Sequence, residues 1–238
     1  MGLLFTIKVE LAAWQGTTGN FVGLFDKLFG GKGSETGAGP RGAAARIPRR
    51  STGFHEFTKA IQKPEGQTIL DLGPTSPANI EYITQLGHRV YNEDVIAAAN
   101  EKGLLIQGEK EGEKVIDVTR FLKDSLSQEP ETFDAVLLWD VCDYLPETLV
   151  KPFIERIHRV TKPKGLLLGF FHTKDAGSDA PYYRYHVKDS QTLELQQGPT
   201  FRLQRVFNNR HIENLFHDYA NIKFFLGKEN VREVLIVR

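Results

Sequence analysis

Short apolar runs and helix-length segments alternate along this chain from about residue 67, and this alternation constrains the fold more than any other feature. The runs "QTILDLG" (67–73) and "HRVYNED" (88–94) are predicted strands, and "SPANIEYITQLG" (76–87) between them carries apolar residues at helical spacing. Two parallel strands need a crossover of a dozen or more residues, which a helix of this length supplies. The alternation therefore predicts a parallel sheet with helices on both faces.

The later part of the chain continues this pattern and then reverses it. Further strands are predicted at 114–118, 132–141 and 166–172, with helices over 95–105 and 146–165. A helix over 210–219 precedes two last strands, 221–227 and 232–238, whose short connection "KENV" forces antiparallel pairing. The expected class is α/β, with a doubly wound, Rossmann-like and mostly parallel seven-stranded sheet that has one antiparallel strand at the C-terminus.

The first fifty residues differ in composition from the rest. Residues 21–33 hold a short amphipathic piece, and residues 30–50 are rich in Gly, Ala and Arg with almost nothing to bury. We therefore predict an N-terminal extension with a flexible arm over 1–50 and one domain over 51–238. Within that domain, 172–207 is longer than a simple connection and is predicted to be a hairpin insertion.

Charge and cysteine content exclude several kinds of protein. The 30 basic and 30 acidic residues give zero formal net charge, so the basic surface usual for nucleic-acid binding is not indicated. Cys142 is the single cysteine, which excludes a disulfide framework within one chain and favours a reducing, cytoplasmic location. No apolar run approaches the ~18 residues of a membrane span. No two histidines have metal-ligand spacing, so no metal site is predicted.

The turn after the first strand, "GPTSPA" (73–78), only partly matches a phosphate-binding loop. A dinucleotide fingerprint would place a second glycine where Thr75 stands, and that glycine exists to let backbone approach a pyrophosphate. No G-K-[ST] follows either, which argues against a nucleotide-triphosphate loop. A nucleoside without a pyrophosphate needs only the close approach at Gly73 and a carboxylate for its ribose. Glu93 and Asp94 lie about 20 residues further on, near the expected spacing.

At this point the chain resembles the class I S-adenosylmethionine-dependent methyltransferases. The matching pieces, in the family's order, are "ILDLG" (69–73), "GHRVYNED" (87–94), "FDAVLLWDVCDYLP" (133–146), "IERIHRVTKPKG" (154–165) and the reversed terminal hairpin. The resemblance covers about residues 65–238 and is greatest to the small-molecule branch often labelled type 11. Two pieces depart from the family pattern. The G-x-G-x-G loop is Gly-Pro-Thr-Ser-Pro here, and the usual P-G-G is Pro-Lys-Gly.

The resemblance implies a cofactor, S-adenosylmethionine, and a set of residues that would bind it. Asp71 and Gly73, with Pro74 and Thr75 in the same turn, would line its methionine end. Asp94 or Glu93 would hold the ribose, Asp117 and Val118 would flank the adenine, and Trp139 and Asp140 would face the donor methyl and the acceptor. Candidates for a general base near the strand ends are Asp140, Asp143, Tyr144 and His172.

The sequence alone determines neither the methyl acceptor nor whether the protein catalyses methyl transfer. The chain lacks the N/D-P-P-Y/F motif of amino-methylating DNA enzymes and a Pro-Cys pair for cytosine C5, so a small-molecule acceptor is the first hypothesis. The 172–207 hairpin would cover it, with Tyr182, Tyr183, Arg184 and Tyr185 available as lining. A methyltransferase-like binding or regulatory module without turnover is the alternative. A nucleotide-dependent oxidoreductase is the third hypothesis, and the missing second glycine argues against it. The oligomeric state is not determined by the sequence.

Overall fold

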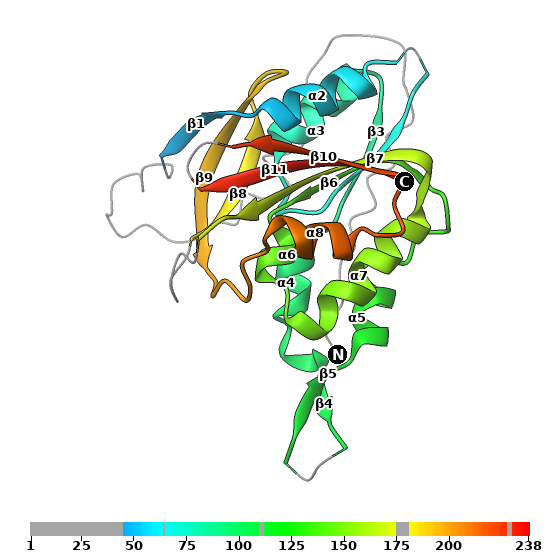
Figure 1. Cartoon of the computed structure of the whole chain (residues 1–238), viewed down its shortest axis with the longest axis vertical. Helices are drawn as coiled ribbons and strands as arrows, with labels where there is room; N and C mark the ends of the chain where they lie inside the picture. The colour runs from blue at the N-terminus through cyan, green and yellow to red at the C-terminus, as the bar shows by residue number, and fades with distance from the viewer. Residues whose placement is uncertain (1–44, 64, 110–111, 175–180, 228–229) are drawn as a thin grey trace, which may run out of the picture. The chain divides into compact units, whose positions relative to one another are not determined.

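The computed structural model describes residues 45–63, 65–109, 112–174, 181–227 and 230–238, and a six-stranded sheet runs through these residues (Figure 1). Its strands, in spatial order, are β10 (Asn221–Leu226), β11 (Val231–Val237), β7 (Thr161–His172), β6 (Phe133–Trp139), β2 (Thr68–Asp71) and β3 (Arg89–Asn92). Strands β7, β6, β2 and β3 are parallel, whereas β11 runs antiparallel to both β7 and β10. The predicted α/β class, parallel core and single reversed strand near the C-terminus are confirmed.

The prediction of seven strands in this sheet is wrong for the described residues. Residues 114–118 were assigned to its third strand, but β5 (Lys114–Ile116) pairs antiparallel with β4 (Leu105–Gln107) in a separate hairpin. The predicted helix over 95–105 is also too long, since α4 ends at Ala99 and the 3₁₀ turn η1 (Lys102–Leu104) leaves the following residues extended. Because β4 and β5 are close in sequence, their pairing closes a shorter loop than a crossover to the edge of the main sheet.

Helices cover both faces of the sheet, as the alternating pattern predicts. On one face lie α2 (Thr52–Ile61) and α3 (Pro77–Gln85), and on the other lie α4 (Val95–Ala99), α5 (Val118–Ser125), α6 (Val141–Tyr144), α7 (Glu147–Val160) and α8 (Asn209–Leu215) (Figure 1). Strand β6 is buried on both sides, with Leu137 in the α2 cluster and Val136 in the α7 cluster. A strand that is buried on both faces carries apolar residues at successive positions, which explains the run "AVLLW" (135–139).

Helix α3 begins and ends where its sequence signals place it. The Ser76 side chain accepts a hydrogen bond from the backbone N–H of Asn79, and Pro77 occupies the first turn. Gly87 follows the helix with φ of 82°, a left-handed conformation that favours glycine. The strand–turn–helix predicted around Gly73 is therefore confirmed, and it fixes the direction in which α3 leaves the sheet.

A second, three-stranded antiparallel sheet lies beside the first, in the order β1-β9-β8. Its strands are β1 (Arg46–Arg50), β9 (Thr192–Thr200) and β8 (Pro181–Val187), and β8 with β9 forms a hairpin inside the predicted insertion 172–207. Residues 46–50, predicted to belong to the flexible arm, form β1 instead, because Arg49 is buried and ion-paired with Glu233 of β11. Residues 1–44, with the predicted amphipathic piece 21–33 and most of the arm, lie outside the described residues.

Two further findings concern the described residues alone. None of their helices has the length and apolar character needed to cross a membrane. No group of three or more His, Cys, Asp or Glu side chains among them could hold a metal ion. The cytoplasmic location stays a prediction.

Candidate functional site

The carboxyl ends of the parallel strands bring four predicted site residues together. Asp71 ends β2, Trp139 ends β6, Asp140 follows it and His172 ends β7. Ligands of doubly wound sheets bind at this edge, where the order of the strands switches between β2 and β6. This edge is therefore the candidate functional site.

Asp71 is buried and both of its carboxylate oxygens are hydrogen-bonded. Oδ1 accepts from Trp139 Nε1 at 2.6 Å, and Oδ2 accepts from Asn79 Nδ2 at 2.9 Å. Burial raises the pKa of Asp71 to about 6, although the hydrogen bonds from Asn79 and Trp139 oppose the rise. Asp71 is thus held by protein donors rather than directed at an open space.

Gly73 makes room for the Trp139 indole. A Cβ atom at position 73 would lie 3.0 Å from Trp139 Cδ1 and 3.3 Å from Nε1. The position that a side chain would occupy at residue 73 is therefore next to protein. The resemblance implies instead that this glycine lines the methionine end of the cofactor. The sequence predicts Gly73 as a position where a ligand approaches the backbone closely, whereas its close neighbour in this structure is an indole ring.

Trp139 itself is held in an unusual conformation. Its φ of 48° lies in the left-handed region, which is uncommon for residues other than glycine. The indole is 2% exposed and stacks on the Tyr185 ring at 4.9 Å with an interplanar angle of 3°. Since such strain persists only where the surroundings hold it in place, the stack and the bond to Asp71 mark a rigid point at the strand edge.

Asn92, which sequence reasoning missed, ties the turn to the end of β3. Its Nδ2 donates to the carbonyl oxygens of Asp71 at 3.0 Å and Gly73 at 2.9 Å. The Thr75 hydroxyl donates to Asn92 Oδ1, so this predicted cofactor residue is engaged within the turn. The available signal was a polar side chain at a strand end, directly before the predicted Glu93 and Asp94.

A cavity of about 210 Å³ opens between this turn, α4 and the β8–β9 hairpin. Two predicted cofactor residues, Pro74 and Asp94, line it. Its other walls include Ala97, Tyr182, Arg184, Gln196 and Phe201. The hairpin therefore supplies one side of the space into which the predicted ribose-binding carboxylate projects.

The predicted cofactor residues that do not line this cavity include Glu93, Asp117 and Val118. Glu93 accepts a hydrogen bond from Gln128 Nε2 at 3.2 Å. Asp117 caps α5 by accepting from the backbone N–H of Arg120, and Val118 packs against the core. The strand before Asp117 pairs with β4 and does not belong to the main sheet, so the adenine contact at Asp117 and Val118 stays a prediction.

A cluster of polar side chains lies directly after Trp139, at the ends of β6 and β7. Asp140 Oδ2 accepts from the Tyr185 hydroxyl at 3.0 Å, while Asp143 Oδ2 accepts from the backbone N–H of His172 at 2.6 Å and pairs with its Nδ1 at 2.8 Å. Tyr144 packs edge-on against His172 with ring centroids 5.8 Å apart. All four candidates for a general base therefore lie close together.

Burial and mutual charge shift the pKa values in this cluster. Burial raises the pKa of Asp143 to about 6, although the His172 hydrogen bond opposes the rise, and burial raises the pKa of Asp140. Burial lowers the pKa of His172, but the hydrogen bond to Asp143 and the charges of both aspartates outweigh this and raise it overall. An ionised Asp143 only accepts hydrogen bonds, so Nδ1 carries the proton and Nε2 of a neutral His172 is left as an acceptor.

The hairpin departs from the strict alternation expected of its strands. Tyr182 and Tyr185 of β8 both turn inward, because the register shifts between Pro181 and Tyr183. The extra residue lies in β9 at Gly198, whose added Cβ would be 2.6 Å from the Tyr182 carbonyl oxygen. A bulge of this kind redirects a side chain, and the Gly-Pro pair at 198–199 was the available signal.

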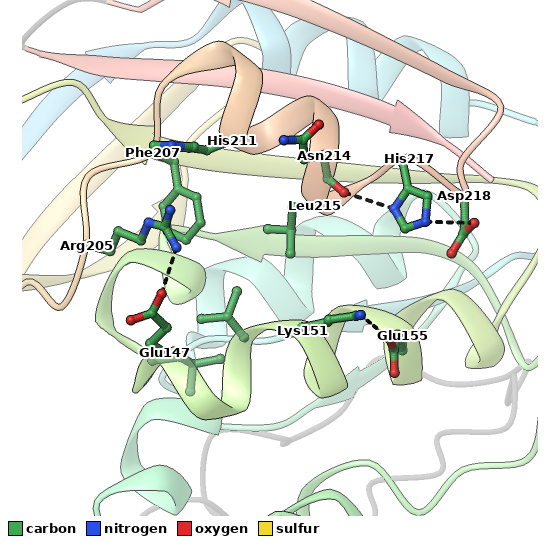
Figure 2. A pocket seen from close by; sticks show the side chains of 12 residues that line it. Glu147, Lys151, Glu155, Arg205, Phe207, His211, Asn214, Leu215, His217 and Asp218 are labelled. Atoms are coloured by element: carbon green, nitrogen blue, oxygen red, sulfur yellow. Dashed lines mark hydrogen bonds and ion pairs between the residues drawn. The ribbon is translucent and has the colours of Figure 1, made fainter.

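A larger cavity, of about 420 Å³, lies between α7 and α8 (Figure 2). Its charged side chains are paired with one another: Arg205 with Glu147 at 3.0 Å and Lys151 with Glu155 at 3.9 Å. It contains none of the residues at the ends of the parallel strands. The cavity between α7 and α8 is the larger of the two, but the predicted site residues Pro74 and Asp94 line the smaller one. We therefore assign the functional site to the smaller cavity.

The buried Asp71 carboxyl makes stability depend on pH. Its pKa is raised from 3.8 to about 6, so the folded chain binds more protons than the unfolded chain between about pH 4 and 6. Its contribution therefore falls as the pH rises through this window, by about 3 kcal/mol in all. We expect the stability of the wild type relative to Asp71→Asn, measured by urea denaturation, to fall by this order between pH 4 and 7.

Asp189→Asn is the control for this experiment. Asp189 is exposed, and although slight desolvation opposes the change, hydrogen bonds from Gln191 and Thr192 lower its pKa. The contribution of this carboxylate should therefore be lost as the pH falls, which is the opposite direction. An Asp71→Asn difference that is constant with pH would contradict the assignment of a raised pKa to Asp71.

Comparison with known proteins bears on what this site does. A family model described as "Methyltransferase domain" matches residues 44–219. No curated protein matches the chain.

Solved structures that are similar to this chain include the following three. One is a 1,6-didemethyltoxoflavin-N1-methyltransferase from Burkholderia thailandensis with bound 1,6-didemethyltoxoflavin and S-adenosylhomocysteine (12% identity, 79% of this chain and 78% of that chain, TM-score 0.43). The others are an S-adenosylmethionine-dependent methyltransferase from Methanosarcina mazei (18%, 75% and 95%, 0.44) and a putative type 11 methyltransferase from Sulfolobus solfataricus (12%, 77% and 90%, 0.44). The family assignment rests on the sequence match rather than on these distant likenesses.

Proposed function

We propose that this chain, which belongs to the methyltransferase domain family, transfers a methyl group to a small-molecule acceptor beneath the β8–β9 hairpin. As a class I S-adenosylmethionine-dependent methyltransferase, it uses S-adenosylmethionine as its cofactor, which supplies a methyl group already activated as a sulfonium. The observation that carries the proposal is the buried pair of Asp140 and Asp143, with His172 bonded to Asp143, which Tyr144 and Tyr182 join to the cavity that Asp94 lines. A site enclosed by one hairpin favours a small acceptor over a polymer, which would need an open groove.

The residues present fit the nucleoside part of this cofactor. Asp94 can accept hydrogen bonds from ribose hydroxyls, and Pro74 and Ala97 supply close, weakly polar walls. The methionine end is different, because the Trp139 indole covers Gly73 and both oxygens of Asp71 are already bonded. The fit therefore supports nucleoside binding at Asp94 and assigns no contact to the methionine end.

The protein's own part in the reaction is positioning and proton transfer. Holding two reactants in line accounts for much of the catalysis of a displacement, and the hairpin and strand ends would enclose both. An acceptor that must lose a proton needs a base, and the Asp143–His172 pair leaves His172 Nε2 to take it. Asp140, whose Oδ1 has no hydrogen-bond partner among the described residues, is the other group placed to receive a proton.

Asp94 and Asp117 offer a matched pair that tests the proposed cofactor position. Both cap a helix through their side chains, and asparagine caps equally well, so either Asp→Asn change should leave the fold intact. We expect Asp94→Asn to weaken S-adenosylhomocysteine binding roughly tenfold, because a charged hydrogen bond is lost, and Asp117→Asn to leave it unchanged. Calorimetric titration of the full chain measures both, and equal effects of the two changes would contradict the assignment.

A binding module without turnover is the second candidate, and the closed methionine end is the observation that favours it. If the Trp139 indole stays over Gly73, the cofactor could bind through its nucleoside alone. Calorimetry with S-adenosylmethionine, followed by assay of S-adenosylhomocysteine release across an acceptor panel, separates the two candidates. Binding without release would favour the module, and absence of binding at millimolar concentration would refute both.

A further inference from the structure

Three buried polar atoms at the candidate site have no hydrogen-bond partner among the described residues. They are Asp140 Oδ1, Asp143 Oδ1 and the Tyr182 hydroxyl, in side chains that are 0%, 0% and 2% exposed. Most buried polar atoms in native proteins are paired, so each exception needs an explanation such as a ligand or a catalytic role. Here the three atoms come from one turn and from the hairpin that covers it.

A shared turn and a ring contact join four side chains into one group, which we call the carboxylate–tyrosine cluster (Asp140, Asp143, Tyr144 and Tyr182). Asp140 and Asp143 share a turn, with the Asp143 N–H donating to the Asp140 carbonyl oxygen at 3.1 Å. The Tyr144 ring lies edge-on to Tyr182, with centroids 5.1 Å apart. The charge of Asp140 contributes to raised pKa values for both tyrosines, after the larger effect of burial. The unpaired atoms therefore belong to one neighbourhood.

Most of the cluster's atoms that lack a described hydrogen-bond partner are acceptors. Two carboxylate oxygens can only accept when ionised, and the one free donor is the Tyr182 hydroxyl. Of the groups whose charge acts on Asp140, the Arg49 guanidinium pairs with Glu233 at 3.4 Å and His172 bonds to Asp143. An anionic acceptor would meet the negative charge of the two carboxylates, whereas a group with several N–H donors would match their free oxygens.

The aromatic rings of this neighbourhood favour a cation in particular. Tyr182 lies edge-on to Phe201 at 5.7 Å as well as to Tyr144, so three rings pack against one another at Tyr182. Ammonium groups bind over such rings through their electrostatic quadrupole, more strongly where water is excluded. Carboxylates and ring faces together form a site typical of a basic amine.

We propose that the acceptor is an amine, which arrives protonated and is held by Asp140, Asp143 and Tyr182. This proposal rests on the proposed methyl transfer and names its substrate class. The ammonium proton passes to a carboxylate, with Asp140 the first choice, and frees the nitrogen lone pair. That pair forms the N–C bond to the methyl group while the S–C bond breaks and its electrons stay on sulfur, so the sulfonium becomes a neutral thioether and one proton is released.

The test compares two probes of nearly equal shape, benzylamine and benzyl alcohol. Each is titrated into the full chain saturated with S-adenosylhomocysteine, and binding is followed by calorimetry and by the shift in Tm. We expect the amine to bind at least roughly tenfold more tightly than the alcohol, the ratio typical of one charged hydrogen bond. With S-adenosylmethionine instead, mass spectrometry should detect N-methylbenzylamine.

Tyr182→Phe is the most discriminating variant. Its hydroxyl bonds to none of the described residues, so the variant should have an unchanged or raised Tm and a several-fold weaker affinity for benzylamine. Asp140→Asn retains an acceptor for Tyr185 and should lose the preference for the amine. Asp124→Asn, in an exposed ion pair with Arg120, is the control that should change neither.

The outcomes separate this proposal from the one on which it rests. If S-adenosylhomocysteine binds but the amine and the alcohol bind equally, or if Tyr182→Phe binds the amine as tightly as the wild type, the amine proposal is overturned and methyl transfer stands. If S-adenosylhomocysteine does not bind, methyl transfer itself is refuted. Preference for the amine with loss in both variants supports the proposal.

Discussion

Replacing Trp139 by alanine is expected to lower the free energy of unfolding by about 3–5 kcal/mol, the cost typical of removing a large buried aromatic side chain. The indole stacks on Tyr185, contacts Phe54 and Phe170 with ring centroids 6.4 and 5.7 Å away, and donates to Asp71. Its removal leaves a cavity and also deprives a buried carboxylate oxygen of its donor, which adds to the cost. Urea denaturation followed by circular dichroism measures the loss without relying on tryptophan fluorescence.

Two further variants show which part of Trp139 matters. Trp139→Phe keeps a ring for Tyr185 but loses the donor to Asp71, so it should cost less than the alanine change and more than a surface change. Leu226→Ala is the surface control, because that side chain is fully exposed at 100% and should cost little. An alanine variant at position 139 that loses under about 1 kcal/mol would contradict the described packing.

Glu233→Ala is expected to cost a similar amount, about 3–5 kcal/mol, because it leaves a buried arginine without its partner. Glu233 Oε1 pairs with Arg49 at 3.4 Å, and Oε2 accepts from the backbone N–H of Gly53 at 2.6 Å. The change therefore leaves the Arg49 guanidinium and the Gly53 N–H without their hydrogen-bond acceptor in the interior between β1, α2 and β11. Urea denaturation at constant pH gives the free energy of unfolding.

The double variant Arg49→Met with Glu233→Leu tests the physical reason. Replacing both members of a buried ion pair by apolar groups is often close to neutral, whereas removing one member is not. We expect the double variant to recover most of the loss, with the remainder due to the Gly53 N–H. A double variant as unstable as Glu233→Ala would show that something other than the stranded charge sets the cost.

Most of the sheet could be predicted from the sequence because its signals are local. The apolar run of β6, the Ser76 cap and the short last connection each determine structure within a few residues, and all three predictions are confirmed. The third strand was wrong because 114–116 can pair either with the main sheet or with nearby 105–107. Periodicity within the segment cannot distinguish these partners.

Parts of the candidate site could be predicted for a similar reason. Residues at the carboxyl ends of parallel strands must share one edge, so Asp71, Trp139, Asp140 and His172 were brought together by topology. The role of Gly73 was not predictable, since its neighbour, the indole, comes from a residue 66 positions later. Nor was the inward turn of Tyr182, which depends on a bulge in a different strand.

By itself the sequence determined the α/β class, the reversed strand near the C-terminus and which strand ends meet, because alternation, helix caps and connection length act over short distances along the chain. The tertiary structure alone decided what the strand edge encloses: an indole over Gly73, a cavity at Asp94 and a buried carboxylate–tyrosine cluster under the hairpin. These features arise where residues that are distant in sequence pack against one another. The burial, charge and hydrogen-bond partners of each side chain there depend on which of these residues become its neighbours.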